Sequence, residues 1–145
     1  MEQTFTPRQV FEETQQLLLA HDIEKYIDFF GENAVIETKF TAAGQPYKIE
    51  GKAAIATILR ASNQASPLKR KAFENTVVHG TDDPNVIIAE YDQISESKNG
   101  SLYTWSDVLI LTVRDGKIQS VRAYSNPIAI AKAMQTVDKL IESLQ

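Results

Sequence analysis

Three turn signals in the second half of the chain constrain the fold more than any other feature. The cluster TDDPN at 81–85 is rich in turn formers, and Asn99–Gly100 and Asp115–Gly116 are dipeptides typical of two-residue β-hairpins. The segments around these turns alternate and are rich in β-branched and aromatic residues. We therefore predict an antiparallel meander of four strands, over 72–79, 86–96, 102–114 and 117–125.

The first half of the chain is predicted to be mainly helical. The sequence TPRQ at 6–9 combines a threonine cap, a proline at the first helical position and a capping-box glutamine. Asp22 can cap a second, short helix, and 52–61 has the apolar spacing of a third. Between these helices, the alternating segment 34–40 predicts a strand, followed by a loop that contains Gly44 and Pro46.

The last predicted element is a single helix that begins at Asn126–Pro127 and continues to Leu140. The expected order is therefore α-α-β-α-β-β-β-β-α in one domain over 1–145. Early helices and a late meander indicate the α+β class. We expect a cone-shaped barrel, in which helices cover the concave face of a curved antiparallel sheet and enclose a pocket for a small, mostly apolar molecule.

Composition excludes several classes of protein. The chain has 145 residues, no cysteine and a formal net charge of −4, which excludes thiol chemistry and disfavours nucleic-acid binding. The only two histidines, His21 and His79, lack metal-binding spacing, so we expect no metal site, and no cofactor motif is present. Without an apolar stretch of membrane-spanning length or a signal peptide, the expected location is the cytoplasm.

The strand at 102–114 carries the best candidate for catalysis. One of its faces holds Tyr103, Trp105 and Asp107, followed by aliphatic residues. If this face lines the pocket, burial would raise the pKa of Asp107 toward the range useful for general acid/base catalysis. In the alternative interpretation Asp107 lies near the pocket mouth, where it is hydrated or paired with a cation such as Arg122 on the next strand.

Further residues are candidates for contact with a bound molecule. Tyr26 and Phe30 lie on the predicted second helix, where they would form core or pocket wall. Tyr124 ends the last strand, so its hydroxyl could reach the pocket. Glu37, next to Thr38 on the first strand, is a minor candidate for the pocket or its rim.

Two charged clusters have simpler explanations. Glu90 and Asp92 share one strand face and could be paired acids, although a solvated face at the end of a hairpin is the favoured interpretation. The basic run Lys69–Lys71 is interpreted as a solvated edge that protects an edge strand against aggregation.

Three segments also match the pattern of a known family. They are AVIETKFTAAGQPYKIEGKAAI at 34–55, VVHGTDDPNVIIAEYD at 77–92 and VRDGKIQSVRAYSNPIAIAKAM at 113–134. Together they resemble the SnoaL-like branch of the nuclear-transport-factor-2-like superfamily, which includes polyketide cyclases, ketosteroid-isomerase-like proteins and phenazine-biosynthesis A/B proteins. The resemblance covers nearly the whole chain and implies the conical fold, on which activities differ widely.

The resemblance also allows the family's catalytic residues to be compared with this chain. The tyrosine and two aspartates of ketosteroid isomerases correspond to Thr14, Thr38 and a position near Leu109. Threonine cannot act as a carboxylate base near neutral pH, and leucine cannot donate a hydrogen bond. The acid/base glutamate of the phenazine-type proteins corresponds to Ala123. The resemblance thus argues against both chemistries by those routes and leaves Thr14 and Thr38 as candidate substrate contacts.

The outer face of the 102–114 strand suggests how the chain associates. It carries threonine, serine and β-branched aliphatic residues, which suit packing against a second sheet. Members of the family often dimerise through this sheet face. The resemblance therefore implies a homodimer. The other expected partner of the chain is a small molecule, and we expect no binding to nucleic acid or membranes.

Two main classes of function stay open at this point. An enzyme would be a cofactor-free isomerase, cyclase or dehydratase in which Asp107 shuttles a proton, while Trp105, Tyr103 and Tyr124 orient a carbonyl-bearing or aromatic substrate. A non-catalytic protein would bind a ligand in the same pocket, or would retain only a vestige of the pocket as an interaction module. The missing family acids favour binding, whereas Asp107 favours catalysis.

Overall fold

The computed structural model describes residues 4–41 and 47–145. Its elements are α1 (Pro7–Leu19), α2 (Ile23–Asp28), β1 (Phe30–Thr38), β2 (Lys48–Glu50), α3 (Lys52–Ala65), β3 (Leu68–Gly80), β4 (Val86–Ser97), β5 (Leu102–Arg114), β6 (Lys117–Tyr124), α4 (Pro127–Met134) and α5 (Val137–Ser143). The expected order is confirmed except for two additions, the short strand β2 and the division of the C-terminal helix into α4 and α5. The loop expected at Gly44–Pro46 lies outside the described residues.

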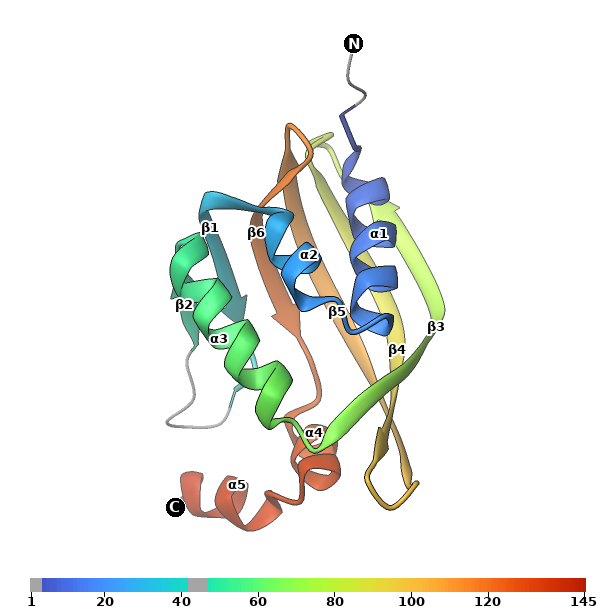
Figure 1. Cartoon of the computed structure of the whole chain (residues 1–145), viewed down its shortest axis with the longest axis vertical. Coiled ribbons are helices and arrows are strands. Elements are labelled where there is room, and N and C mark those ends of the chain that lie inside the picture. Colours follow the sequence, from blue (N-terminus) through green and yellow to red (C-terminus); the bar gives the residue numbers. More distant parts are fainter. Residues whose placement is uncertain (1–3, 42–46) are drawn as a thin grey trace.

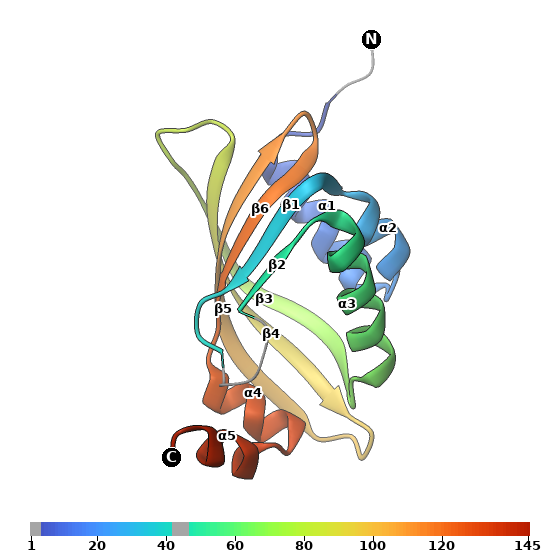
Figure 2. The same cartoon turned by 90° about the vertical axis from the view of Figure 1, so that its left-hand side faces the viewer.

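The six strands form one curved sheet in the order β2-β1-β6-β5-β4-β3. Helices α1, α2 and α3 lie across the concave face of this sheet, and α4 and α5 lie at one of its ends (Figures 1 and 2). The expected α+β class is confirmed. The apolar core lies between the concave face and the helices, and its most buried members include Val10 of α1, Phe30 of β1, Ile55 of α3, Val113 of β5 and Ile118 of β6.

The sheet differs from the expected antiparallel sheet in one pairing. The β3–β6 meander is antiparallel, as predicted from its turns, and so is the β1–β2 pair. Strand β1, however, runs parallel to β6, with Ile36 beside Val121. Hairpin signals predict pairing only between strands that are neighbours in sequence, so they could not predict the pairing of β1 with β6.

Several element boundaries also differ from the prediction, and three of the differences matter most. Strand β1 begins at Phe30, so this residue belongs to a strand and not to the second helix. Strand β3 begins at Leu68 and therefore includes the basic run. The expected single C-terminal helix is wrong, because Gln135 adopts a left-handed conformation with φ of 58° and the Thr136 amide closes α4 by donating to the Ala131 carbonyl at 2.8 Å.

The helix caps were predicted correctly. The Gln9 amide donates to Oγ1 of Thr6 at 3.2 Å, and the Thr6 amide donates to Oε1 of Gln9 at 2.9 Å. Oδ1 of Asp22 accepts from the Lys25 amide at 3.2 Å, and Oδ1 of Asn126 accepts from two amides at the start of α4. These local bonds fix where each helix begins along the sheet.

Candidate active site

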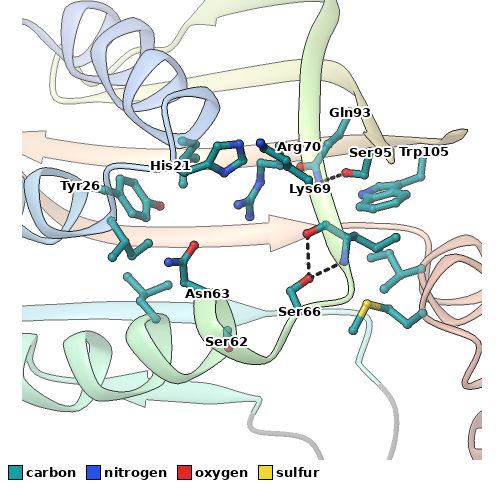
Figure 3. A pocket seen from close by; sticks show the side chains of 16 residues that line it. His21, Tyr26, Ser62, Asn63, Ser66, Lys69, Arg70, Gln93, Ser95 and Trp105 are labelled. Atoms are coloured by element: carbon teal, nitrogen blue, oxygen red, sulfur yellow. Dashed lines mark hydrogen bonds between the residues drawn. The ribbon is translucent and has the colours of Figure 1, made fainter. Parts of the chain in front are cut away.

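A cavity of about 460 Å³ lies between the concave face of the sheet and helices α2, α3 and α4 (Figure 3). Aliphatic side chains and a thioether form one part of its wall: Leu18, Ile23, Leu59, Leu68, Ile130 and Met134. The other part is polar and includes His21, Asn63, Arg70, Gln93 and Ser95. The pocket is therefore more polar than the sequence predicted.

Two of the aromatic residues proposed from the sequence line this cavity. Trp105 reaches it from β5 and is only 8% exposed, and Tyr26 reaches it from α2. The Tyr26 ring also packs edge to face on Phe30, with ring centroids 5.3 Å apart. Burial raises the pKa of the Tyr26 hydroxyl, although the positive charge of Arg70 opposes this shift. Tyr26 and Trp105 lie at opposite ends of the cavity, with His21 and Arg70 between them (Figure 3).

Arg70 is the main site residue that sequence reasoning missed. Simple alternation along β3 would place Arg70 and Phe73 on opposite faces of the sheet. A β-bulge after Arg70 shifts the register, so that Arg70 pairs with Ser95 and Phe73 pairs with Gln93. Ser95 and Gln93 share the concave face, and Arg70 therefore enters the cavity from the strand that had been interpreted as a solvated edge (Figure 3).

The Arg70 side chain enters the cavity without satisfying all of its donors. Its Nε is buried and has no hydrogen-bond partner. Burial, followed by the positive charges of Lys69, Arg70 and Lys71, lowers the pKa of His21 at the same cavity. This end of the cavity is therefore electropositive.

Asp107 lies where the cavity meets the hydrophobic core. It follows Trp105 on the same face of β5, and its partner across the sheet is the buried Tyr91 of β4. The Asp107 residue is 7% exposed, and its Oδ1 accepts a hydrogen bond from the Ser125 hydroxyl. Burial raises the pKa of Asp107, and this effect exceeds the opposing effects of the Ser125 hydrogen bond, the Arg70 charge and a hydrogen bond from Trp105.

The cation next to Asp107 differs from the one considered in the sequence. Arg122 pairs with Ile110 and is exposed on the convex face of the sheet, away from Asp107. The charge that acts on Asp107 is that of Arg70, two strands away on β3. The Asp107 carboxyl group and the Arg70 guanidinium therefore influence one another across the concave face, although they come from different strands.

Several proposed contact residues lie outside this cavity. Phe30 is a core residue, and Thr14 is buried with its hydroxyl donating to the Phe11 carbonyl at 2.9 Å. Glu37 forms an ion pair with Lys39 at 2.7 Å. The ring of Tyr124 packs edge to face against Phe40. Tyr103 is half-buried opposite Ser95, two pairs beyond Trp105 toward the β4–β5 turn.

Thr38 lines a second cavity, of about 420 Å³, on the other side of α4. Ser125 also lines this second cavity, although its hydroxyl is bonded to Asp107. Ile130 and Met134 line both cavities, so helix α4 forms the wall between them.

The acids at Glu90 and Asp92 belong to the convex face, as the simpler interpretation predicted. Oε2 of Glu90 lies 2.7 Å from Nε2 of His79. Asp92 accepts hydrogen bonds from Ser106 at 2.6 Å and Asn75 at 2.8 Å, and these bonds lower its pKa.

Among residues 4–41 and 47–145 there is no cluster of three or more metal-ligating side chains. No helix in the same described ranges is long and apolar enough to cross a membrane.

Comparison with known proteins agrees with this architecture. Residues 8–121 match the model of the SnoaL-like domain. The uncharacterised protein YesE of Bacillus subtilis is 30% identical over 117 residues, which are 80% of this chain and 78% of that protein. A crystal structure of a B. subtilis protein provisionally assigned as an isomerase has a TM-score of 0.82 and 27% identity, covering 90% of this chain and 93% of that one.

A more distant structure shares the fold and contains a ligand. It is Rv0760c of Mycobacterium tuberculosis in complex with estradiol-17β-hemisuccinate, with a TM-score of 0.67 and 23% identity over 84% of this chain and 95% of that one. At this identity the likeness shows the fold alone. The family expected from the three sequence segments is confirmed, and the chain belongs to the SnoaL-like domain family.

Proposed function

We propose that this protein binds a small molecule in the cavity beside Trp105 and that Asp107 exchanges a proton with it, as in a cofactor-free isomerase or cyclase. One observation carries the proposal: a carboxyl group with a raised pKa lies at the junction of the cavity and the core. Groups with this combination of burial, nearby charge and cavity are frequent in catalytic sites.

The chemistry follows from the two protonation states of Asp107. In its protonated state the carboxyl group can donate a proton or a hydrogen bond to a substrate oxygen. In its ionised state it can accept a proton from a carbon next to a carbonyl group. The positive charge of Arg70 favours the ionised state of Asp107, in which the carboxylate can accept a proton.

The relatives support the small-molecule part of this proposal. One structural relative is provisionally assigned as an isomerase, and another was solved with a steroid ester bound. Trp105 supplies a flat apolar surface that a ring system would contact.

Binding without turnover is a second candidate function, and a specific observation favours it. Asp107 is close to the cavity but is not part of its wall, and its Oδ1 already accepts from Ser125. The positions of the family acids, Thr38 and Ala123, carry no carboxylate. A ligand-binding protein needs the cavity but not the proton transfer.

The test begins with native mass spectrometry of freshly purified protein, which identifies any small molecule that copurifies. That molecule, or a panel of cyclic ketones, is then incubated in D₂O, and proton exchange next to the carbonyl is followed by NMR. We expect Asp107→Asn to slow exchange by about 100-fold or more. The matched control is Asp92→Asn on the convex face, which should exchange at the wild-type rate. Binding with no exchange in the wild type would support the second candidate.

We also propose that the protein forms a homodimer through the convex face of the sheet. Ile88, Val108 and Ile110 of this face are only half-buried in the single chain, and Val77 is 48% exposed. Light scattering should give twice the chain mass, and Ile110→Glu should reduce it to the mass of one chain. A wild-type monomer at micromolar concentration would contradict this proposal.

A further inference from the structure

We propose that the molecule bound in the cavity is an organic anion, with a carboxylate held by Arg70 and an apolar body against the opposite wall. This inference rests on the proposed function for the location of the ligand and adds its chemical class. The starting observation is the guanidinium of Arg70, which enters the cavity from β3 and forms no ion pair within the described residues (Figure 3).

A guanidinium that lines a cavity without an ion-pair partner indicates what a ligand should supply. Leaving a buried donor unsatisfied is unfavourable, more so when the group is charged. Within the described parts of the chain, the guanidinium of Arg70 takes part in no ion pair, unlike Arg60, which is bonded to Glu24 at 2.7 and 2.9 Å. The missing acceptor is therefore best supplied by a bound molecule.

The geometry of a guanidinium favours a carboxylate as this acceptor. The two terminal nitrogens of a guanidinium each direct one N–H outward in parallel, and the two oxygens of a carboxylate match that fork. A neutral carbonyl offers a single oxygen and no charge. A carboxylate at the two terminal nitrogens of Arg70 would accept two hydrogen bonds and neutralise the cation in one contact.

The other charges around the cavity favour the same class of ligand. Lys69 lines the cavity beside Arg70, and the wall contains no carboxylate within the described residues. His21 also lines the wall, where burial and the positive charges of Lys69, Arg70 and Lys71 lower its pKa and favour the neutral imidazole. Asp107 is the acid behind the wall, and its carboxyl group is bonded to Ser125 and forms no ion pair with Arg70.

The opposite wall explains why a free inorganic anion is not the expected ligand. Leu59, Ile130 and Met134 present apolar surface that a small hydrated ion would leave uncovered. A cavity of about 460 Å³ has room for a ring system attached to the charged group. The combination of one fork-shaped cation and one apolar wall selects an amphipathic acid.

The chain contains its own probe for testing this inference. Trp105 is its single tryptophan and lines the cavity, so a change in tryptophan emission reports occupancy. The test ligands are two matched pairs that do not absorb at the excitation wavelength: adamantanecarboxylate with its amide, and tert-butylbenzoate with its amide. Titration calorimetry on the same samples gives the dissociation constants.

We expect each acid to bind wild-type protein at least about tenfold more tightly than its amide, because the charge-assisted fork is lost in the amide. Arg70→Met should remove this preference while the amide still binds. Arg70→Lys keeps the charge without the fork and should give an intermediate preference. Arg8→Met, which removes an exposed arginine of α1 that does not line the cavity, should bind like the wild type.

Three results would overturn the inference. Equal binding of acid and amide to the wild type, with a change in Trp105 emission, would reject the anion and leave the proposed cavity function intact. An acid preference that persists in Arg70→Met would reject Arg70 as the anchor. No binding of any probe at millimolar concentration would reject the cavity function as well. The first and third comparisons use only wild-type protein, so the folding of a variant cannot obscure them.

Discussion

Ser125 and Asp107 are joined by a hydrogen bond that connects the end of β6 to the middle of β5. The Ser125 hydroxyl donates to the carboxyl group, and the serine also lines the second cavity beyond α4. This contact opposes burial in setting the pKa of Asp107, because it favours the ionised carboxylate. The properties of the candidate acid thus depend on a residue that lies just before the C-terminal helices.

Removal of that hydroxyl should raise the pKa of Asp107 further. In Ser125→Ala the carboxylate loses a hydrogen bond that stabilises its charged form, while its burial remains. The titration of Asp107, assigned by carboxyl ¹³C NMR against Asp107→Asn, should move to higher pH in the variant. An unchanged titration would show that the hydroxyl has no influence on the ionisation of this carboxyl group.

The contribution of Asp107 to the free energy of unfolding should decrease as pH rises. Its pKa in the folded protein lies above the ordinary 3.8, so the folded state holds this proton more tightly than the unfolded chain. The resulting stabilisation is fully present below 3.8 and is lost as pH rises through the raised pKa. Urea unfolding should therefore show Asp107→Asn gaining stability relative to the wild type as pH increases.

Asp92 provides the opposite sign on the convex face. Hydrogen bonds from Ser106 and Asn75 lower its pKa, so its contribution is present above 3.8 and is lost as pH falls through the lowered value. Asp92→Asn should therefore lose stability relative to the wild type as pH increases. Parallel pH dependence of the two variants would contradict the assigned environments.

Arg70→Met should stabilise the ligand-free protein. The substitution removes a buried donor without a partner and retains apolar contact at the cavity wall. We expect an increase of about 1–2 kcal/mol in the free energy of unfolding. The check is urea denaturation of ligand-free samples, with Arg8→Met on α1 as the exposed control. A loss of stability would mean that Arg70 holds the fold together and has a structural role.

The start of helix α4 should be sensitive to its cap. Oδ1 of Asn126 accepts from the amides of Ile128 and Ala129, both at 3.1 Å. Asn126→Ala should cost about 1 kcal/mol. Hydrogen exchange should accelerate across 127–134, while the amides of β5 keep their protection. Uniform acceleration over the whole chain would instead indicate that α4 unfolds only with the rest of the molecule.

Local signals in the sequence predicted much of this fold. The hairpin dipeptides placed the meander, and the TPRQ and Asn126–Pro127 sequences placed helix starts, because turns and caps depend on a few adjacent residues. The alternation along β5 also grouped Trp105 with Asp107 on one face, and both are buried in the structure. Each of these inferences needs no knowledge of distant parts of the chain.

The features of the fold and of the site that the sequence did not predict depend on contacts between distant segments of the chain. The bulge after Arg70 reverses the alternation of β3, and no glycine or proline next to it marks the site. For that reason the basic run was interpreted as solvated when one of its members enters the cavity. The parallel pairing of β1 with β6 and the left-handed Gln135 between α4 and α5 likewise have no strong local signal.

The position of helix α4 has a consequence for how such a protein could change its ligand. Ile130 and Met134 separate two cavities of similar volume, whereas Asp107 and Arg70 belong to the sheet. Smaller residues at these two helix positions would merge the spaces into a longer channel and leave the acid and the cation in place. Ligand length and ligand chemistry are therefore encoded in separate segments, and mutation can alter the first without disturbing the second.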